Sequence, residues 1–198
     1  MPTRIYLASS NPGKVRELAA LAQAEGIVAE PLPNYARLPA ACEEHQSFAL
    51  NALEKALHYS RFTDDLVVAD DSGLVVDALG GAPGVRSARY AGPTATDEDN
   101  NRKLLDELRL VPEAQRTARY VCVLVLAQGY RTRALFSDTC EGRILETPQG
   151  TGGFGYDPLF FYPPLEKALA EIEPAEKNRH SHRGKAFRKL LTYLRRRT

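Results

Sequence analysis

Two adjacent aspartates interrupt an apolar run in the stretch VVADDSGLVV, residues 67–76. Residues 67–69 are typical of a buried strand, and Asp70 and Asp71 point to opposite sides if the strand continues through them. One carboxylate then faces a cleft at the strand end. A carboxylate fixed by a strand is suited to hold Mg²⁺ or an attacking water in phosphoryl chemistry. From these residues alone, a simple Asp-Ser-Gly turn is the alternative.

A second polar stretch, SSNPGK at residues 9–14, lies between an apolar strand at residues 5–8 and an amphipathic helix. Asn11 is suited to cap that helix, and Pro12 suits its first position. The backbone N–H groups of a helix N-terminus and the charge of Lys14 can together bind an anion. Val15 follows Lys14, so the Walker pattern is absent. The stretch is either a phosphate loop of another design or a plain helix cap.

A second source of carboxylates is the pair Glu43 and Glu44, which precedes a helix predicted over residues 47–62 with Ser47 as its cap. Magnesium that bridges phosphates commonly uses one or two protein carboxylates. One of these glutamates together with one aspartate would therefore be sufficient.

The stretch GTGGFGYDP, residues 150–158, combines glycines with aromatic rings. Glycines allow close approach of a ligand to the backbone, and the ring of Phe154 or Tyr156 can stack on a nucleobase. Asp157 can accept a hydrogen bond from a base or a ribose. A strained turn explains the glycines equally well.

Cations are concentrated in EKNRHSHRGK, residues 176–185, directly before an amphipathic C-terminal helix. Such a run is usually a solvated face. With Ser181 as helix cap, however, His182 and Arg183 fall at the positive end of the helix, which the macrodipole disfavours. This unfavourable placement indicates an anionic or polar ligand.

The expected elements indicate an α/β fold with a mixed sheet and flanking helices. Strands and helices alternate early in the chain, and a long β-hairpin follows at residues 116–146 with its turn at QGY. A further helix is predicted near residues 96–108 and a short strand at residues 159–162. The C-terminal helix is expected to bury its apolar residues Phe187, Leu190, Leu191 and Leu194.

Composition excludes several classes of protein. The 198 residues contain 26 Lys and Arg against 25 Asp and Glu, so the net charge does not favour binding to nucleic acid or to a membrane surface. The apolar runs are too short to span a bilayer and no signal peptide is recognised, so we expect a cytosolic protein. The 3 cysteines lack metal-ligand spacing and are expected to be reduced thiols.

The stretches SSNPGKVREL, EEHQSFALNALEKA, ADDSGLVVDALGGAPGVRSARYAG, GTGGFGYDPLF and EKNRHSHRGKA together resemble the inosine triphosphate pyrophosphatase family, in order and in spacing. The likeness covers nearly the whole chain. It implies an ITPase-like (Maf/Ham1) fold, with residues 1–198 forming a single domain of two lobes around a central cleft. It also implies Mg²⁺-dependent hydrolysis of ITP, dITP and XTP to the monophosphate and pyrophosphate, which keeps these nucleotides out of DNA and RNA.

The resemblance also assigns roles to residues. Asp71 is implied as the catalytic carboxylate and a metal ligand, with Asp70 in support and Glu44, or its neighbour Glu43, as the second metal ligand. The residues implied to bind the triphosphate and the adjoining substrate atoms are Ser9, Ser10, Asn11, Pro12, Gly13, Lys14 and Ser72. Those implied to bind the base or close over the nucleotide are Phe154, Gly155, Tyr156, Asp157, Lys177, His182 and Arg183.

The family's second motif often has Thr-Gly before Thr-Phe, whereas this chain has HQSF at residues 45–48. The resemblance places GGAPGVRSARYAG near a dimer contact, so a homodimer is expected. Two alternatives remain open. A Maf-like pyrophosphatase would act on modified pyrimidine nucleotides, and a non-enzymatic RNA-binding module would use LRRRT and the basic run near His180.

Overall fold

A mixed seven-stranded sheet forms the framework of the chain, in the order β2-β1-β3-β4-β5-β6-β7. The computed structural model describes residues 3–196. Strand β1 runs parallel to β2 and β3, whereas β6 runs antiparallel to β5 and β7. The strands are β1 (Arg4–Ala8), β2 (Val28–Pro31), β3 (Leu66–Val76), β4 (Thr117–Gln128), β5 (Arg131–Ile144), β6 (Phe160–Tyr162) and β7 (Lys167–Ala168). The mixed α/β fold expected from the sequence is confirmed.

Within the described residues, five α-helices accompany the strands: α1 (Pro12–Gln23), α2 (Phe48–Tyr59), α3 (Asp97–Leu108), α4 (Pro174–His180) and α5 (His182–Arg195). The expected caps are present at two of them. Asn11 caps α1 by accepting from the Lys14 N–H, and Ser47 caps α2 by accepting from the Leu50 N–H. Helix α4 was not predicted.

The chain divides into two compact units. The first unit comprises Met1–Asp71, Cys122–Asp138 and His182–Thr198, and the second comprises Ser72–Val121 and Thr139–Ser181. The cleft between two lobes, expected from the resemblance, stays a prediction.

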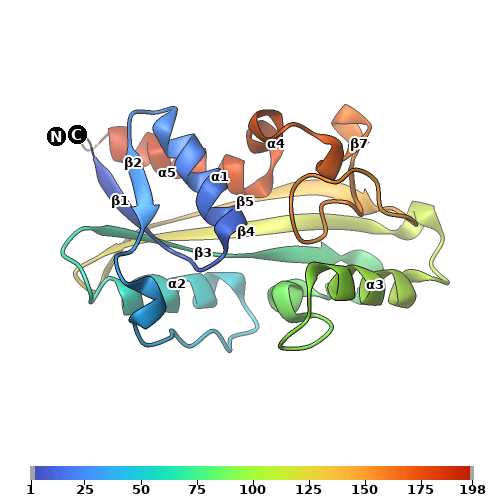
Figure 1. Cartoon of the computed structure of the whole chain (residues 1–198), viewed down its shortest axis with the longest axis horizontal. Helices are drawn as coiled ribbons and strands as arrows, with labels where there is room; N and C mark the ends of the chain where they lie inside the picture. The colour runs from blue at the N-terminus through green and yellow to red at the C-terminus, as the bar shows by residue number, and fades with distance from the viewer. Residues whose placement is uncertain (1–2, 197–198) are drawn as a thin grey trace. The chain divides into compact units, whose positions relative to one another are not determined.

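In the first unit, α1 and α5 cover one face of the sheet and α2 covers the other (Figure 1). The apolar stripe of α1 buries Leu18 and Ala22, and α5 buries Phe187, Leu190, Leu191 and Leu194 as predicted. These side chains pack with Ile5 and Leu7 of β1 and Leu124 of β4 in one core. The part of the sheet that belongs to the first unit is therefore covered by helices on both faces.

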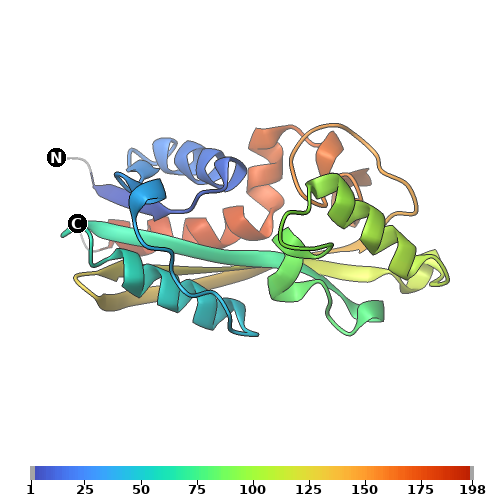
Figure 2. The same ribbon diagram turned by 60° about the horizontal axis from the view of Figure 1, so that its bottom comes forward.

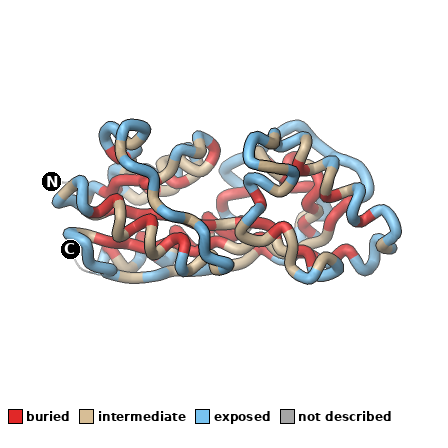
Figure 3. Tube along the Cα trace, turned by 90° about the horizontal axis from the view of Figure 1, so that it is seen from below, coloured by how far each residue is buried: buried red, intermediate tan, exposed pale blue. Residues whose placement is uncertain are grey.

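The second unit has its own core. Leu104 and Leu108 of α3 pack with Leu74 of β3 and Phe160 of β6. Figure 3 shows buried stretches along the strands and exposed residues in the connecting loops. The segment at residues 154–157 is anchored in this core by Tyr156.

The predicted hairpin is confirmed. Only Gly129 and Tyr130 separate β4 from β5, and both have positive φ angles, of 54° and 58°. Two consecutive residues in this conformation form the turn whose twist matches paired strands.

One boundary expected from the sequence is wrong. The apolar strand does not end at the aspartates, and the alternative Asp-Ser-Gly turn does not form, because β3 continues from Leu66 to Val76. The polar pair therefore lies in the middle of a buried strand.

Candidate active site

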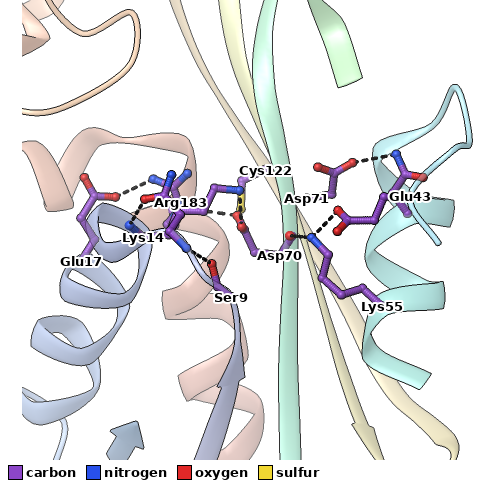
Figure 4. A network of polar contacts seen from close by, with 11 residues as sticks. Ser9, Lys14, Glu17, Glu43, Lys55, Asp70, Asp71, Cys122 and Arg183 are labelled. Atoms are coloured by element: carbon purple, nitrogen blue, oxygen red, sulfur yellow. Dashed lines mark hydrogen bonds and ion pairs between the residues drawn. The ribbon is translucent and has the colours of Figure 1, made fainter. Parts of the chain in front are cut away.

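Asp70 and Asp71 point to opposite sides of β3, as alternation along a strand requires (Figure 4). Both side chains are buried, since Asp70 is 3% and Asp71 9% exposed. Buried carboxylates are unfavourable unless they are paired or hydrogen-bonded. Each aspartate has a different set of partners, and these partners define its chemistry.

Asp70 is surrounded by cations. The Lys14 Nζ lies 2.5 Å from its Oδ1, and the Arg183 Nε lies 3.5 Å from its Oδ2. Burial alone would raise the pKa of Asp70, but the charges of Lys14 and Arg183 outweigh it and hold the pKa well below its usual range. Asp70 is therefore an ionised, charge-compensated anchor for two cations.

Arg183 connects three elements of the first unit. Its Nη1 lies 2.5 Å from the Glu17 Oε2 of α1, while its Nε reaches Asp70 of β3. Burial would lower the pKa of Arg183, but Glu17 and Asp70 raise it, so the guanidinium stays charged. These carboxylates offset the unfavourable position of a cation at the start of α5. A contact of Arg183 with the base stays a prediction.

The residues expected to form a phosphate loop lie in the first unit, and phosphate binding by them stays a prediction. The Asn11 N–H donates to the Ser9 Oγ at 3.2 Å, and the Asn11 Oδ1 accepts from the Lys14 N–H at 3.1 Å. Gly13 is buried in the first turn of α1. The loop carries Ser10 and Pro12 and directs Lys14 to Asp70, so a cation and a helix N-terminus lie together.

On the other side of β3, Asp71 contacts α2. The Asn51 Nδ2 donates to the Asp71 Oδ2 at 3.0 Å and to the His45 carbonyl at 3.1 Å. Burial raises the pKa of Asp71, and the Asn51 hydrogen bond and the charges of Lys14 and Lys55 act against this rise. Asp71 combines a strand-fixed carboxylate with a raised pKa, as expected of a general base.

Lys55 lies one helical turn after Asn51 and is 8% exposed. Its Nζ lies 2.5 Å from the Glu43 Oε2 and donates to the Asp70 carbonyl at 3.2 Å. The sequence interpretation missed both Asn51 and Lys55. The sequence did contain a signal for them, because Asn51 and Lys55 lie on the buried face of the helix. Polar residues in such positions usually have a specific hydrogen-bond or charge partner.

The structure distinguishes the two glutamates. Glu43 is partly buried and paired with Lys55, whereas Glu44, the residue favoured by the resemblance, is exposed. Glu43, rather than Glu44, is thus the glutamate that pairs with a residue of α2. Ser72, the next residue of β3, is half-buried.

The donor chemistry fits a hard divalent cation. Within residues 3–196 no group of three or more His, Cys, Asp or Glu side chains is arranged to hold a metal ion. Asp71 and Glu43 nevertheless supply carboxylate oxygens beside α2, and Mg²⁺ that bridges phosphates needs only one or two.

In the second unit, the predicted base-binding residues gather around Asp157. Its Oδ2 accepts from the Phe154 N–H at 2.9 Å and lies 2.6 Å from the Lys177 Nζ. The Lys177 Nζ is also 4.9 Å from the centre of the Phe154 ring. Lys177 and Phe154, far apart in the sequence, thus meet at one carboxylate.

The two rings offered by this segment differ. Tyr156 is 3% exposed and its hydroxyl donates to the Ser87 carbonyl at 2.8 Å, whereas Phe154 is only partly buried. Tyr156 is therefore a core residue. Stacking of the Phe154 ring on a base stays a prediction.

His182 is buried at the first position of α5. It belongs to the first unit, and Lys177 belongs to the second. Their joint action on one nucleotide stays a prediction.

Among residues 3–196, none of the helices has the length and apolar character needed to cross a bilayer.

Comparisons with known proteins agree on one family. Residues 5–193 match the model of the Ham1 family. The chain is 51% identical over 186 residues to a dITP/XTP pyrophosphatase of Geobacillus kaustophilus, covering 94% of this chain and 91% of the relative. It is 45% identical over 193 residues to a dITP/XTP pyrophosphatase of Desulforamulus reducens, covering 98% and 96%.

A solved structure shows the same fold. The HAM1 protein from Coxiella burnetii superimposes with a TM-score of 0.87 at 38% identity, covering 98% of this chain and 99% of the other.

Proposed function

The chain belongs to the Ham1 family, and we propose that it hydrolyses dITP, XTP and ITP to the nucleoside monophosphate and pyrophosphate. The arrangement around β3 carries the proposal: Asp71, buried and bonded to Asn51, lies near the charges of Lys14 and Lys55. A carboxylate among fixed cations suits the hydrolysis of a phosphoric anhydride. We propose that this activity removes non-canonical purine nucleotides from the cytosolic pool.

The first unit takes the triphosphate in this proposal. The loop from Ser9 to Lys14 offers hydroxyl groups and helix N-terminal amides to phosphate oxygens, and Lys14 supplies a positive charge. Asp70 holds the ammonium group of Lys14 at 2.5 Å, so the cation is oriented before substrate arrives. Such preorganised charge is usually the largest electrostatic contribution to phosphoryl chemistry.

Asp71 orients the attacking water and accepts its proton. The water oxygen attacks the α-phosphorus, the bond to the bridging oxygen of the β-phosphate breaks, and pyrophosphate leaves. Asn51 fixes the Asp71 carboxylate through the 3.0 Å hydrogen bond to its Oδ2.

We propose that Asp71 and Glu43 hold Mg²⁺, because both present carboxylates beside α2. When bound, Mg²⁺ neutralises phosphate charge and stabilises the leaving group. Lys55, which pairs with Glu43 in the structure, is then available to the phosphates.

The second unit takes the base. Phe154 stacks on the purine, and the Lys177 ammonium group, held by Asp157, donates toward the 6-oxo group. In the proposal, His182 and Arg183 complete the donors to this edge. Adenine presents an amino group there, which would leave buried donors unpaired, so ATP is rejected.

Product analysis tests the proposal. The purified protein is incubated with Mg²⁺ and dITP, XTP, ITP, GTP, ATP or a modified pyrimidine triphosphate, and pyrophosphate is assayed separately from phosphate. Pyrophosphate from the first three, with little from the others, is expected. Release of phosphate, or equal rates on all six, contradicts the proposal.

Removal of the metal tests the magnesium assignment separately. Dialysis against EDTA should abolish pyrophosphate release, and added Mg²⁺ should restore it. Full activity in EDTA would contradict the assignment of Asp71 and Glu43.

A further inference from the structure

Helix α3 holds both polar groups of Gly155. The Gly155 N–H donates to the Asp97 Oδ2 at 2.7 Å, and the Asn101 Nδ2 donates to the Gly155 carbonyl at 3.0 Å. Asp97 and Asn101 are four residues apart, so they share one face of α3. Figure 2 shows α3 in green, with the orange loop that carries this segment above and behind it. Nothing in the sequence interpretation gave either residue a role.

The helix is a rigid support. Its first turn is closed by a reciprocal capping box between Thr96 and Asp99, and Leu104 and Leu108 are fully buried in the core of the second unit. The side chains that contact Gly155 therefore project from a backbone that is fixed at both ends of the helix. A ligand-binding segment attached to such an element is positioned more precisely than a free loop.

Gly155 directly follows Phe154, the ring assigned to the base. The Phe154 N–H donates to Asp157 and the next N–H, of Gly155, donates to Asp97. Gly155 has a φ of +63°, a conformation that other residues seldom adopt. Two carboxylates thus fix two successive N–H groups, and the direction of the Phe154 side chain is defined from both sides.

The Asn101 side chain is retained at a cost. Its Oδ1 is buried and has no hydrogen-bond partner among residues 3–196. A buried acceptor without a partner is unfavourable, so its presence in a native structure calls for a compensating use. The bond from its Nδ2 to Gly155 supplies that use.

We propose that Asp97 and Asn101 are positioning residues for base recognition, which hold the Gly155 peptide and thereby set the Phe154 ring for stacking on the purine. The inference rests on the proposed function and deepens it. In this proposal Asp97 and Asn101 act only through the segment at residues 154–157.

The charge of Asp97 can also stabilise α3 directly, and a control variant separates this effect from the contact with Gly155. Acidic residues in the first turn stabilise a helix by interaction with its dipole. Glu98 lies next to Asp97, carries the same charge in the same turn and is exposed. Glu98→Ala therefore removes the dipole contribution without the Gly155 contact.

The experiment compares Asp97→Ala, Asn101→Ala and Glu98→Ala in the full chain, with kcat and KM for dITP and ATP and the Tm of each variant. Hydrogen bonds to charged groups are strong enough for their loss to change affinity by about tenfold or more. We expect Asp97→Ala to raise KM for dITP roughly tenfold with a smaller change in kcat, and to reduce the dITP/ATP ratio of kcat/KM. Asn101→Ala should act in the same direction, and Glu98→Ala should match wild type.

A double-mutant cycle with Phe154→Ala tests whether the residues act through the ring. If they do, Asp97→Ala causes no further rise of KM once Phe154 is absent. Effects that multiply in the double variant would indicate a merely structural role and overturn the proposal. An unchanged KM and base selectivity in both single variants would also overturn it. If Asp97→Ala does not fold, Asn101→Ala decides the same question.

The activity of the wild-type protein distinguishes a failure of the positioning role from a failure of the proposed function. A wild-type protein that releases no pyrophosphate from dITP contradicts the proposed function, and the positioning role is lost with it. An active wild type whose Asp97 and Asn101 variants keep KM and selectivity contradicts the positioning role alone.

Discussion

Asp70 and Asp71 are neighbours in sequence with opposite surroundings. Asp70 lies among cations that keep its pKa low, whereas burial raises the pKa of Asp71 beside Asn51. Alternation along β3 separates the two environments by a single peptide bond. One carboxylate anchors two cations, and we propose that its neighbour performs the chemistry.

We expect Asp71→Asn to reduce kcat by roughly 10²- to 10⁴-fold, the usual contribution of a positioned acid or base. The fold should be retained, because the asparagine oxygen can still accept from Asn51. Pyrophosphate release and Tm are measured together. The matched variant Asp70→Asn removes the charged partner of the buried Arg183 and of the partly buried Lys14, and it should lower the free energy of unfolding by about 3–5 kcal/mol. Wild-type turnover in Asp71→Asn would refute the assignment of the base.

Glu43→Gln and Glu44→Gln distinguish the two candidate metal ligands. Glu43 is paired with Lys55, whereas Glu44 is exposed. We expect Glu43→Gln to raise the Mg²⁺ concentration for half-maximal activity by roughly tenfold or more, a typical effect of changes close to a metal. Glu44→Gln serves as the control and should behave as wild type. The reverse pattern would restore Glu44 to the role that the resemblance gave it.

The sequence predicted most of the residues that lie around β3 but not all. Lys14, Asp70, Asp71 and Arg183 were selected because charged residues stood at strand ends and helix starts. Asn51 and Lys55 were missed because they sit inside an ordinary amphipathic helix. Their partners, Asp71 and Glu43, lie in other elements, and local periodicity contains no information on such long-range pairs.

At the scale of elements, the segment at residues 153–157 depends on close packing. A Cβ on Gly153 would lie 2.1 Å from the Asp157 Oδ2, and the φ of Gly153 is +74°. The glycine is therefore required by space as well as by backbone conformation. This requirement connects GTGGFGYDP to the carboxylate that holds Lys177.

We expect Gly153→Ala to raise KM for dITP by roughly tenfold or more, because Asp157 must move and release Lys177 and the Phe154 N–H. The matched variant is Gly80→Ala, whose φ is +62° but whose Cβ would meet nothing within 4 Å. It carries the same backbone strain, about 1 kcal/mol, without the collision. Steady-state kinetics on both variants make the comparison, and equal KM values would contradict the packing argument.

Helices, strands and turns were predicted well where residues close in the sequence determine them. The hairpin, the caps of α1 and α2 and the buried stripe of α5 follow from turn residues, capping residues and periodicity. The end of β3 was misplaced because charged residues are seldom buried within a strand unless they are paired. The pairs that make it possible come from residues 14 and 183, distant in the sequence.

At the scale of the whole molecule, burial separates the 3 cysteines into two classes. Cys42 is exposed, and Cys122 and Cys140 are buried. Burial and the charge of Asp70 also raise the pKa of the Cys122 thiol, which keeps it protonated. We expect one thiol to react rapidly with Ellman's reagent in the native protein and all 3 to react in denaturant. Rapid reaction of a second thiol in the native protein would contradict the burial of Cys122 and Cys140.

The expected homodimer is tested by light scattering after size-exclusion chromatography. A particle of twice the chain mass of 21.9 kDa is expected, and it should persist on dilution. The segment GGAPGVRSARYAG is the proposed contact, so Arg86→Glu should produce particles of the single-chain mass. A wild-type protein of single-chain mass would contradict the prediction.

The first unit is assembled from three separate stretches of chain, the last of which begins at His182. A protein leaves the ribosome from its N-terminus, so Asp70 emerges more than a hundred residues before Arg183, its partner at 3.5 Å. Until Arg183 emerges, the Asp70 carboxylate, which is buried in the folded protein, has Lys14 but not Arg183 to compensate its charge. A messenger that ends before the codon for Arg183 would therefore yield a chain that also has a defect at Asp70 of β3, far from its missing end.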